Sequence, residues 1–572
     1  MSKFKSLFVL LSVIFGLISV AVFIYCVFYF SDKGFEITDE TFYLYFTEHL
    51  NPDIYLTTNF GVLNNFACLG KISIINLRIT KLVFQIVAIT IFIYCLFFYL
   101  RKNNCVLSKN NMLLISVSIV MASFVNYDYL PMTLSYNTWT LILSLFCFSL
   151  IFIELINKVK TVQLLTSFGY GFLTFCLFLV KFPNSVIMIM IYVFINFMFN
   201  RKLWSIKIIT FFSGTLISYL IFINDYNHLL NIISNYKVAL FDLKYMSTGS
   251  YLEQFKSFIL LCYQLNYLSY LVIIILLTIG ISKFNKSKNQ IINYIPILLN
   301  LGFAITFFKG NSQNLYNDFM VFCLLILNGF IYIILNKSSL VKINYFSEIH
   351  IISFILMILP VGLMLGTNNM FYYTASQSMC FSLAGIILLM SCKSEIDFFY
   401  LPISSVFVCA FVFSVDYFGA VKTPYRQSNL LEKNIPINFH PYLDGIYESK
   451  ERFIDYSAMN IISNKLSPST KKVVTFFSYM GLNYIANKNT FPECPMSDGE
   501  NYIEADKYIL SREHFNDSFE LIIVPSKVYN NLKFKSMFAQ FGVCFDKNYK
   551  LKFSYTLLST KETVYFYKKN SL

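Results

Sequence analysis

The sequence predicts a polytopic α-helical membrane protein that carries a soluble α/β domain at its C-terminal end. The chain of 572 residues is 56% hydrophobic and only 13% charged, whereas soluble globular proteins contain about 25% charged residues. Its apolar residues fall mostly into runs of about 18 residues or more, the length that crosses a bilayer. Near Asp416 the composition changes to that of a soluble domain. These three observations set the predicted division of the chain.

A helical domain resembling a membrane bundle is predicted over residues 1–415. The first apolar run follows Lys3 and Lys5 and is longer than the roughly 7–15 apolar residues of a signal peptide, so we interpret it as an uncleaved first helix. Thirteen runs are expected to span the membrane: 7–30, 79–100, 112–133, 138–156, 164–181, 184–199, 207–223, 258–280, 291–308, 316–335, 349–366, 376–392 and 398–415.

The charges of the loops predict the orientation of these spans. Lys and Arg cluster in the loops that the count places in the cytoplasm, as the positive-inside rule requires, and acids such as Asp32 and Glu36 gather in the first loop on the other side. We therefore expect a multi-pass protein of the cell (inner) membrane, with a cytoplasmic N-terminus and a periplasmic or extracellular C-terminal domain. The net charge of +14 follows these loops and not one continuous face, which argues against nucleic acid as a partner.

Two parts outside the spans are expected to fold. The first external loop, residues 31–78, predicts surface-lying helices near 39–50 and 59–75. The C-terminal domain, residues 416–572, predicts strands at 471–479, 519–524 and 563–568 and helices at 448–465 and 528–541. Its two cysteines, Cys494 and Cys544, either pair in an oxidising compartment or remain two buried thiols.

The sharpest chemical feature is the pair Asp39-Glu40, directly after the first helix. Adjacent carboxylates beside a membrane can serve as a general base or as metal ligands. The structural alternative is that Thr38 caps a helix whose dipole favours both acids. The sequence leaves both interpretations open.

Further polar residues are expected on the same external side. Lys181 is either an ammonium that binds a phosphate or a lysine that snorkels to the interface, and Lys309 has the same ambiguity. On a shared side, cations would suit a phosphate, amides would suit hydroxyl groups, and one carboxylate would suit proton transfer at an anionic lipid headgroup. The other candidates, each equally compatible with a turn, a loop residue or an interfacial anchor, are Tyr136, Asn137, His228, Asn368, Asn369 and Arg426.

The chain resembles the GT-C-fold glycosyltransferases, which include the protein mannosyltransferases and the aminoarabinose transferases. The resemblance lies in a first helix followed by the external pair Asp39-Glu40, surface-lying helices in a long first loop, eleven to thirteen spans and an external C-terminal α/β domain. The resemblance implies transfer of a hexosyl or pentosyl group, with inversion, from a polyprenyl-phosphate donor to a glycan or glycolipid acceptor of the cell envelope. It implies that Asp39 is the general base or a carboxylate that positions the acceptor, and that Glu40 orients the acceptor or a divalent cation, the one cofactor considered. Lys181, Lys309 and Arg426 would neutralise the departing lipid phosphate. The peptide-reading motifs of oligosaccharyltransferases are not visible, so a protein acceptor is not expected.

Other classes of protein remain as alternatives. A lipid-glycan flippase or transporter predicts repeated halves and charges at mid-membrane depth, and no such repeat is found. An O-antigen-type polymerase or ligase would usually place its long external loop late among the helices. A structural or sensory membrane protein is the remaining alternative.

Overall fold

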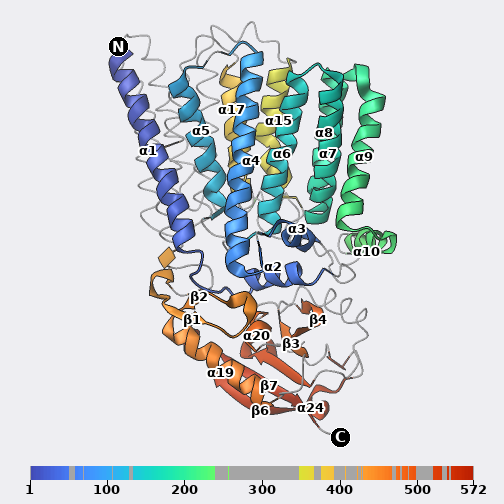
Figure 1. The fold of residues 1–572 in the computed structure, drawn as a ribbon. Coiled ribbons are helices and arrows are strands. Elements are labelled where there is room, and N and C mark those ends of the chain that lie inside the picture. The colour runs from blue at the N-terminus through green and yellow to red at the C-terminus, as the bar shows by residue number, and fades with distance from the viewer. Residues whose placement is uncertain are drawn as a thin grey trace.

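The structure is a computed structural model. Its helices form an upright bundle, and the C-terminal domain lies against one end of that bundle, opposite the N-terminus (Figure 1). We call this end the domain end. The structure describes residues 2–50, 58–68, 70–105, 107–127, 133–238, 256, 260, 347–365, 375–391, 406, 421–422, 427, 429–466, 472–476, 480–486, 489–496, 520–530, 538–539 and 543–570.

Seven helices in the described ranges are long and apolar enough to cross a membrane, and they coincide with seven of the predicted spans. Two shorter apolar helices, α15 (Glu348–Leu363) and α17 (Met379–Ser391), match two more. The predicted spans 258–280, 291–308, 316–335 and 398–415 lie almost wholly outside the described residues, so the total of thirteen stays a prediction. The seven are α1 (Ser2–Tyr29), α4 (Ile74–Lys102), α5 (Lys109–Phe124, extended by a short 3-10 turn), α6 (Tyr136–Ile156), α7 (Lys160–Val180), α8 (Phe182–Phe199) and α9 (Trp204–Phe222).

Helices α7 and α9 approach each other closely because each has a glycine at their crossing. A Cβ atom added at Gly171 would lie 2.0 Å from the backbone oxygen of Phe211, and one added at Gly214 would lie 1.9 Å from that of Phe168. Close backbone approach through small residues is how membrane helices commonly associate, since lipid provides no hydrophobic drive between them. This crossing holds α7, which leads to Lys181, firmly against its neighbour.

A buried ion pair joins three helices at the end of the bundle that lies away from the C-terminal domain. Lys207 of α9 pairs with Glu154 of α6 and donates to Asn196 Oδ1 of α8 at 2.9 Å. Both charges lie near helix ends, in the first turn of α9 and the last turn of α6. The pair therefore ties helix ends together and does not mark a charged site at mid-membrane depth, which the transporter alternative would need.

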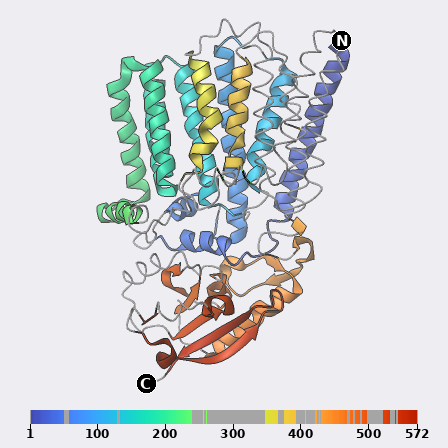
Figure 2. The ribbon, with the colours of Figure 1, turned by 180° about the vertical axis from the view of Figure 1, so that it is seen from behind.

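The first loop contains the two short helices expected from the sequence. They are α2 (Asp39–Glu48) and α3 (Phe60–Ala67), and α3 is shorter than the predicted 59–75. Both lie at the domain end, between the bundle and the C-terminal domain (Figures 1 and 2). Gly61 lets them meet, because a Cβ atom there would lie 1.8 Å from the backbone oxygen of Phe46. The first loop is thus a packed layer at this end of the bundle.

The C-terminal domain is built on a mixed five-stranded sheet in the order β4-β3-β5-β7-β6. Strand β3 pairs in parallel with β4 and β5, whereas β7 is antiparallel to β5 and β6. The central strand β5 is buried along its whole length, as its unbroken apolar sequence predicts. The three predicted strands are confirmed. The strands are β3 (Lys472–Phe476), β4 (Asn489–Met496), β5 (Leu521–Pro525), β6 (Tyr549–Thr556) and β7 (Thr563–Lys569).

A long helix and a small hairpin sheet complete the domain. Helix α19 (Lys450–Leu466) confirms the predicted helix 448–465, and its buried Asp455 accepts the backbone N–H groups of Leu558 and Ser559 at 2.8 and 2.9 Å. The smaller sheet pairs β1 (Ile435–Ile437) with β2 (Ile446–Glu448). The helix predicted at 528–541 lies mostly outside the described residues, and the short helix α22 (Ser526–Tyr529) ends two residues into that range, with Asn530 at its C-cap. The exposed Cys544 is a free thiol, and the predicted boundary at Asp416 lies outside the described residues.

Candidate functional site

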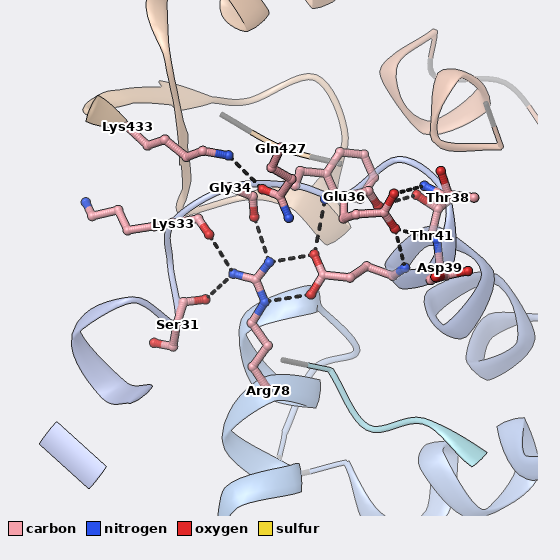
Figure 3. Close-up of polar contacts among 12 residues, drawn as sticks. Ser31, Lys33, Gly34, Glu36, Thr38, Asp39, Thr41, Arg78, Gln427 and Lys433 are labelled. Carbon is pink, nitrogen blue, oxygen red and sulfur yellow. Dashed lines mark hydrogen bonds and ion pairs between the residues drawn. The ribbon is translucent and has the colours of Figure 1, made fainter. Parts of the chain in front are cut away.

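The acidic segment, residues 36–40, begins with a carboxyl group that caps helix α2. Glu36 Oε1 accepts the Thr38 N–H at 2.9 Å, and Oε2 accepts the N–H groups of Asp39 and Glu40, the latter at 3.1 Å (Figure 3). The structural alternative drawn from the sequence had Thr38 as the capping side chain. Thr38 occupies the N-cap position, but its side chain makes no capping hydrogen bond. Burial, followed by repulsion from Asp39, raises the pKa of Glu36 to about 8.

Glu40 is the counter-ion of a buried arginine. Arg78 Nε donates to Glu40 Oε1 at 2.9 Å and Nη2 donates to Oε2 at 2.6 Å, and each side chain is only 1% exposed. The same guanidinium donates to the backbone oxygens of Ser31, Lys33 and Gly34 at 2.7–3.1 Å. Sequence reasoning missed Arg78, although an arginine at the start of an apolar span needs a partner. Both oxygens of the Glu40 carboxylate are therefore occupied.

Asp39 differs from its neighbour in its surroundings. It is half-buried in the first turn of α2, where the helix dipole favours a negative charge. Tyr43 follows it by one helical turn on the same face. The Tyr43 ring centroid lies 6.2 Å from that of Tyr136, the first residue of α6. The helix that carries Asp39 thus contacts one of the predicted site residues.

Lys181 occupies the corner between α7 and α8 and is buried, only 3% exposed, so it does not snorkel. Its Nζ donates to Asn137 Oδ1 at 2.8 Å and lies 5.3 Å from the ring centroid of the same Tyr136. Among the described residues no carboxylate pairs with it. Because an ammonium group only donates, Asn137 must present its oxygen to Lys181, which leaves Nδ2 buried without a hydrogen-bond partner in the described structure.

The first loop is tied to this corner by two hydrogen bonds. Thr58 Oγ1 donates to the Val180 backbone oxygen at 2.8 Å, and the Asn59 N–H donates to that of Leu179 at 2.6 Å. Both acceptors belong to the last turn before Lys181. The structure therefore brings the acidic segment and Lys181 to one end of the bundle, with the first loop and the Tyr43–Tyr136 contact between them.

The remaining predicted site residues are not joined to this group by a described contact. His228 is half-buried on α10 (Tyr226–Lys237), a helix at the domain end that is anchored by the Tyr236 hydroxyl to the Phe178 backbone oxygen at 3.0 Å. Within the described ranges, no group of three or more His, Cys, Asp or Glu residues is placed to hold a metal ion. Lys309, Asn368, Asn369 and Arg426 lie outside the described residues.

Comparisons with known proteins add little to this geometry. No family model matches the chain, and no curated protein matches its sequence. Among solved structures, the chain is similar to the crystal structure of the Archaeoglobus fulgidus oligosaccharyltransferase in the apo form, at 12% identity and a TM-score of 0.45, covering 100% of this chain and 75% of that one. A likeness at this score does not assign a function to the chain.

Proposed function

We propose that this chain is a membrane glycosyltransferase that moves a sugar from a polyprenyl-phosphate donor to a glycan or glycolipid acceptor, with inversion. The domain end of the bundle then faces the periplasm or the cell exterior. This end carries the C-terminal domain and α2, the helix that begins with Asp39 (Figure 1). Lys181 follows the last turn of α7, which accepts two hydrogen bonds from the first loop.

One observation carries the proposal: a buried ammonium group without an anion. A charge taken out of water is unfavourable unless it is paired, and Lys181 has only an amide oxygen and an aromatic face among its described contacts. The unpaired Nδ2 of Asn137 is a second buried donor beside it. A buried ammonium group without an anion, with a second buried donor on the residue that it contacts, is what a phosphate group would satisfy.

The proposed reaction is a single displacement at the anomeric carbon. The Asp39 carboxylate accepts the proton of the acceptor hydroxyl while the oxygen of that hydroxyl bonds to the anomeric carbon. The bond from the anomeric carbon to the phosphate oxygen breaks at the same time. The electron pair leaves with the lipid phosphate, whose added charge Lys181 Nζ and Asn137 Nδ2 stabilise. Donors aimed at developing charge in a site without water are among the strongest catalytic contributions. Attack opposite the leaving group inverts the configuration.

Glu40 has a different role in this proposal from the one expected from the sequence. Because Arg78 occupies both of its oxygens, we assign it to fixing α2 and not to orienting the acceptor or a metal ion. Of the two carboxylates, only Asp39 could be a ligand of a divalent cation, so the proposed reaction includes no metal ion.

The proposal is tested by turnover of defined donors. The purified protein in nanodiscs is given radiolabelled polyprenyl-phosphate hexoses and pentoses, and released polyprenyl phosphate is measured. Asp39→Asn should lower kcat by about 10²-fold or more, in line with loss of a general base. Asp444→Asn, on an exposed residue of the C-terminal domain, is the matched control and should turn over like wild type. Equal rates for Asp39→Asn and wild type would remove Asp39 as the base.

A further inference from the structure

We propose that the C-terminal domain positions the Asp39 carboxylate, because it binds the segment, residues 32–37, that leads into Asp39. Glu448 and Gly481 are the positioning residues. The inference builds on the proposed function in one respect, namely that the Asp39 carboxylate reacts.

The first contact is a strand added to the small sheet. The Gly34 N–H donates to the Tyr447 backbone oxygen and the Tyr447 N–H donates to that of Asp32, both at 2.8 Å. Residues 32–34 therefore run beside β2 as an extra strand, with Lys33 bridged to Tyr447. Backbone pairing of this kind fixes the register of the added segment. The chain enters the acidic segment from a position that the C-terminal domain sets.

Glu448 extends this pairing by a side-chain hydrogen bond. Its Oε1 accepts the Phe35 N–H at 2.7 Å, four residues before Asp39. Glu448 also forms an ion pair with Lys433 at 3.2 Å, and neither side chain is exposed. Burial lowers the pKa of Lys433 to about 8. A buried ion pair is weak evidence for added stability, since apolar residues of the same volume often serve as well. Its clear structural effect here is to aim a carboxylate oxygen at Phe35.

The second contact is made by the short helix α20 (Gly481–Ile485), which meets the chain at Ile37, just before α2. The Gly481 N–H donates to the Ile37 backbone oxygen at 2.7 Å, just before Asp39. A Cβ atom at Gly481 would lie 2.8 Å from Ile37 Cα and 2.8 Å from Thr41 Oγ1. At the other end of α2, the Tyr484 hydroxyl donates to Glu48 Oε2 at 2.9 Å. The domain thus contacts α2 at both ends.

These contacts fix the candidate base from both sides along the chain. Residues 32–37 are held by β2 and α20, and Glu40 is held by Arg78. Asp39 lies between the two fixed points. Displacing a reacting group by about 1 Å can lower a rate by about 10²-fold, so the domain should control kcat without touching the lipid phosphate.

The first test uses Gly481→Ala, which forces Ile37 and Thr41 to move. We expect kcat for sugar transfer to fall about 10- to 100-fold, with the affinity for polyprenyl phosphate at Lys181 unchanged within about twofold. Amide hydrogen exchange of residues 35–41 should rise. The matched control is Gly362→Ala, where the added Cβ would meet Ile187 at an ordinary 3.5 Å, and it should leave both readouts at the wild-type level.

The second test separates the hydrogen bond to Phe35 from the ion pair. Glu448→Ala/Lys433→Met removes both, whereas Glu448→Gln/Lys433→Met removes the charges but keeps an oxygen that can accept the Phe35 N–H. The Ala variant should lose kcat and protection of Phe35 from exchange. The Gln variant should keep both kcat and the protection of Phe35 near the wild-type level. If Glu448 served only to stabilise the fold, the two variants would behave alike.

The two proposals fail in different ways. If wild-type protein turns over no donor, the proposed function fails, and hydrogen exchange alone still decides whether the domain holds the segment. If Gly481→Ala exchanges and turns over like wild type while Asp39→Asn is inactive, the positioning role is overturned and the glycosyltransferase proposal stands. Equal behaviour of the two Glu448 variants would likewise overturn it.

Discussion

Replacing Glu40 with Gln tests whether this carboxylate serves structure more than chemistry. The change keeps the size of the side chain but removes the counter-ion of Arg78. Breaking a buried ion pair from one side costs about 3–5 kcal/mol. Arg78 keeps three backbone oxygens as acceptors, so we expect the lower value, about 3 kcal/mol. Arg78→Met also strands those oxygens, so we expect about 5 kcal/mol.

The free energy of unfolding can be measured by SDS titration in mixed micelles. Reaction of the buried thiols of Cys147 and Cys380 provides the readout, because both become accessible only when the bundle opens. In a double-mutant cycle, Glu40→Gln with Arg78→Met should destabilise less than the sum of the single changes, by about 1–3 kcal/mol.

Two results would refute this reasoning. Additive effects within about 0.5 kcal/mol would mean that the two side chains are not coupled. A fully stable Glu40→Gln protein that has lost turnover as completely as Asp39→Asn would return Glu40 to the chemistry.

Other consequences of the structure can be measured in the same preparations. The pKa of Glu36, about 8 in the folded protein, exceeds its ordinary value of 4.5, so its contribution to stability is complete below about pH 4.5 and is lost as the pH rises through 8. Thermal unfolding midpoints should therefore fall between pH 5 and pH 9 in wild type and fall less in Glu36→Gln; equal slopes would contradict the assignment. Gly214→Val should lower the unfolding midpoint by several degrees because its side chain meets the Phe168 backbone, whereas Gly362→Ala should not; an unchanged midpoint would mean that α7 and α9 do not cross so closely. In the C-terminal domain, Asp455→Asn should weaken the tie between α19 and the β6–β7 turn and lower protection of the Leu558 and Ser559 amides; unaltered exchange would show that the helix is held elsewhere.

The bundle was predictable because its determinants are local. A run of apolar residues long enough to cross a bilayer is visible without knowledge of its neighbours, and α1, α4 and α6 fall where such runs predict. Strand β5 was also visible from local sequence, as a short unbroken run of apolar residues. Where the prediction of a helix differs from the structure, the difference is in where the helix ends: α3 ends at Ala67, whereas the predicted helix extended to residue 75.

The partners within the site were not predictable in this way. Glu40 pairs with Arg78, 38 residues later, and Phe35 pairs with Glu448, 413 residues later. Such contacts depend on how helices pack and on where the domain docks, which periodicity does not encode. Counting spans did place Asp39 and Lys181 on one side. It could not show that Tyr43 and Tyr136 would lie between them.

Binding of a lipid phosphate at Lys181 tests the central claim most directly. Purified wild type, Lys181→Gln and the exposed-residue control Lys71→Gln are titrated with polyprenyl phosphate, with the uncharged polyprenol as a second ligand, and the dissociation constants are compared. We expect Lys181→Gln to bind the phosphate at least about tenfold more weakly, consistent with loss of a charge-assisted hydrogen bond of about 1.5–3 kcal/mol, while Lys71→Gln and polyprenol binding stay unchanged. Equal affinity of wild type and Lys181→Gln for polyprenyl phosphate would contradict the account.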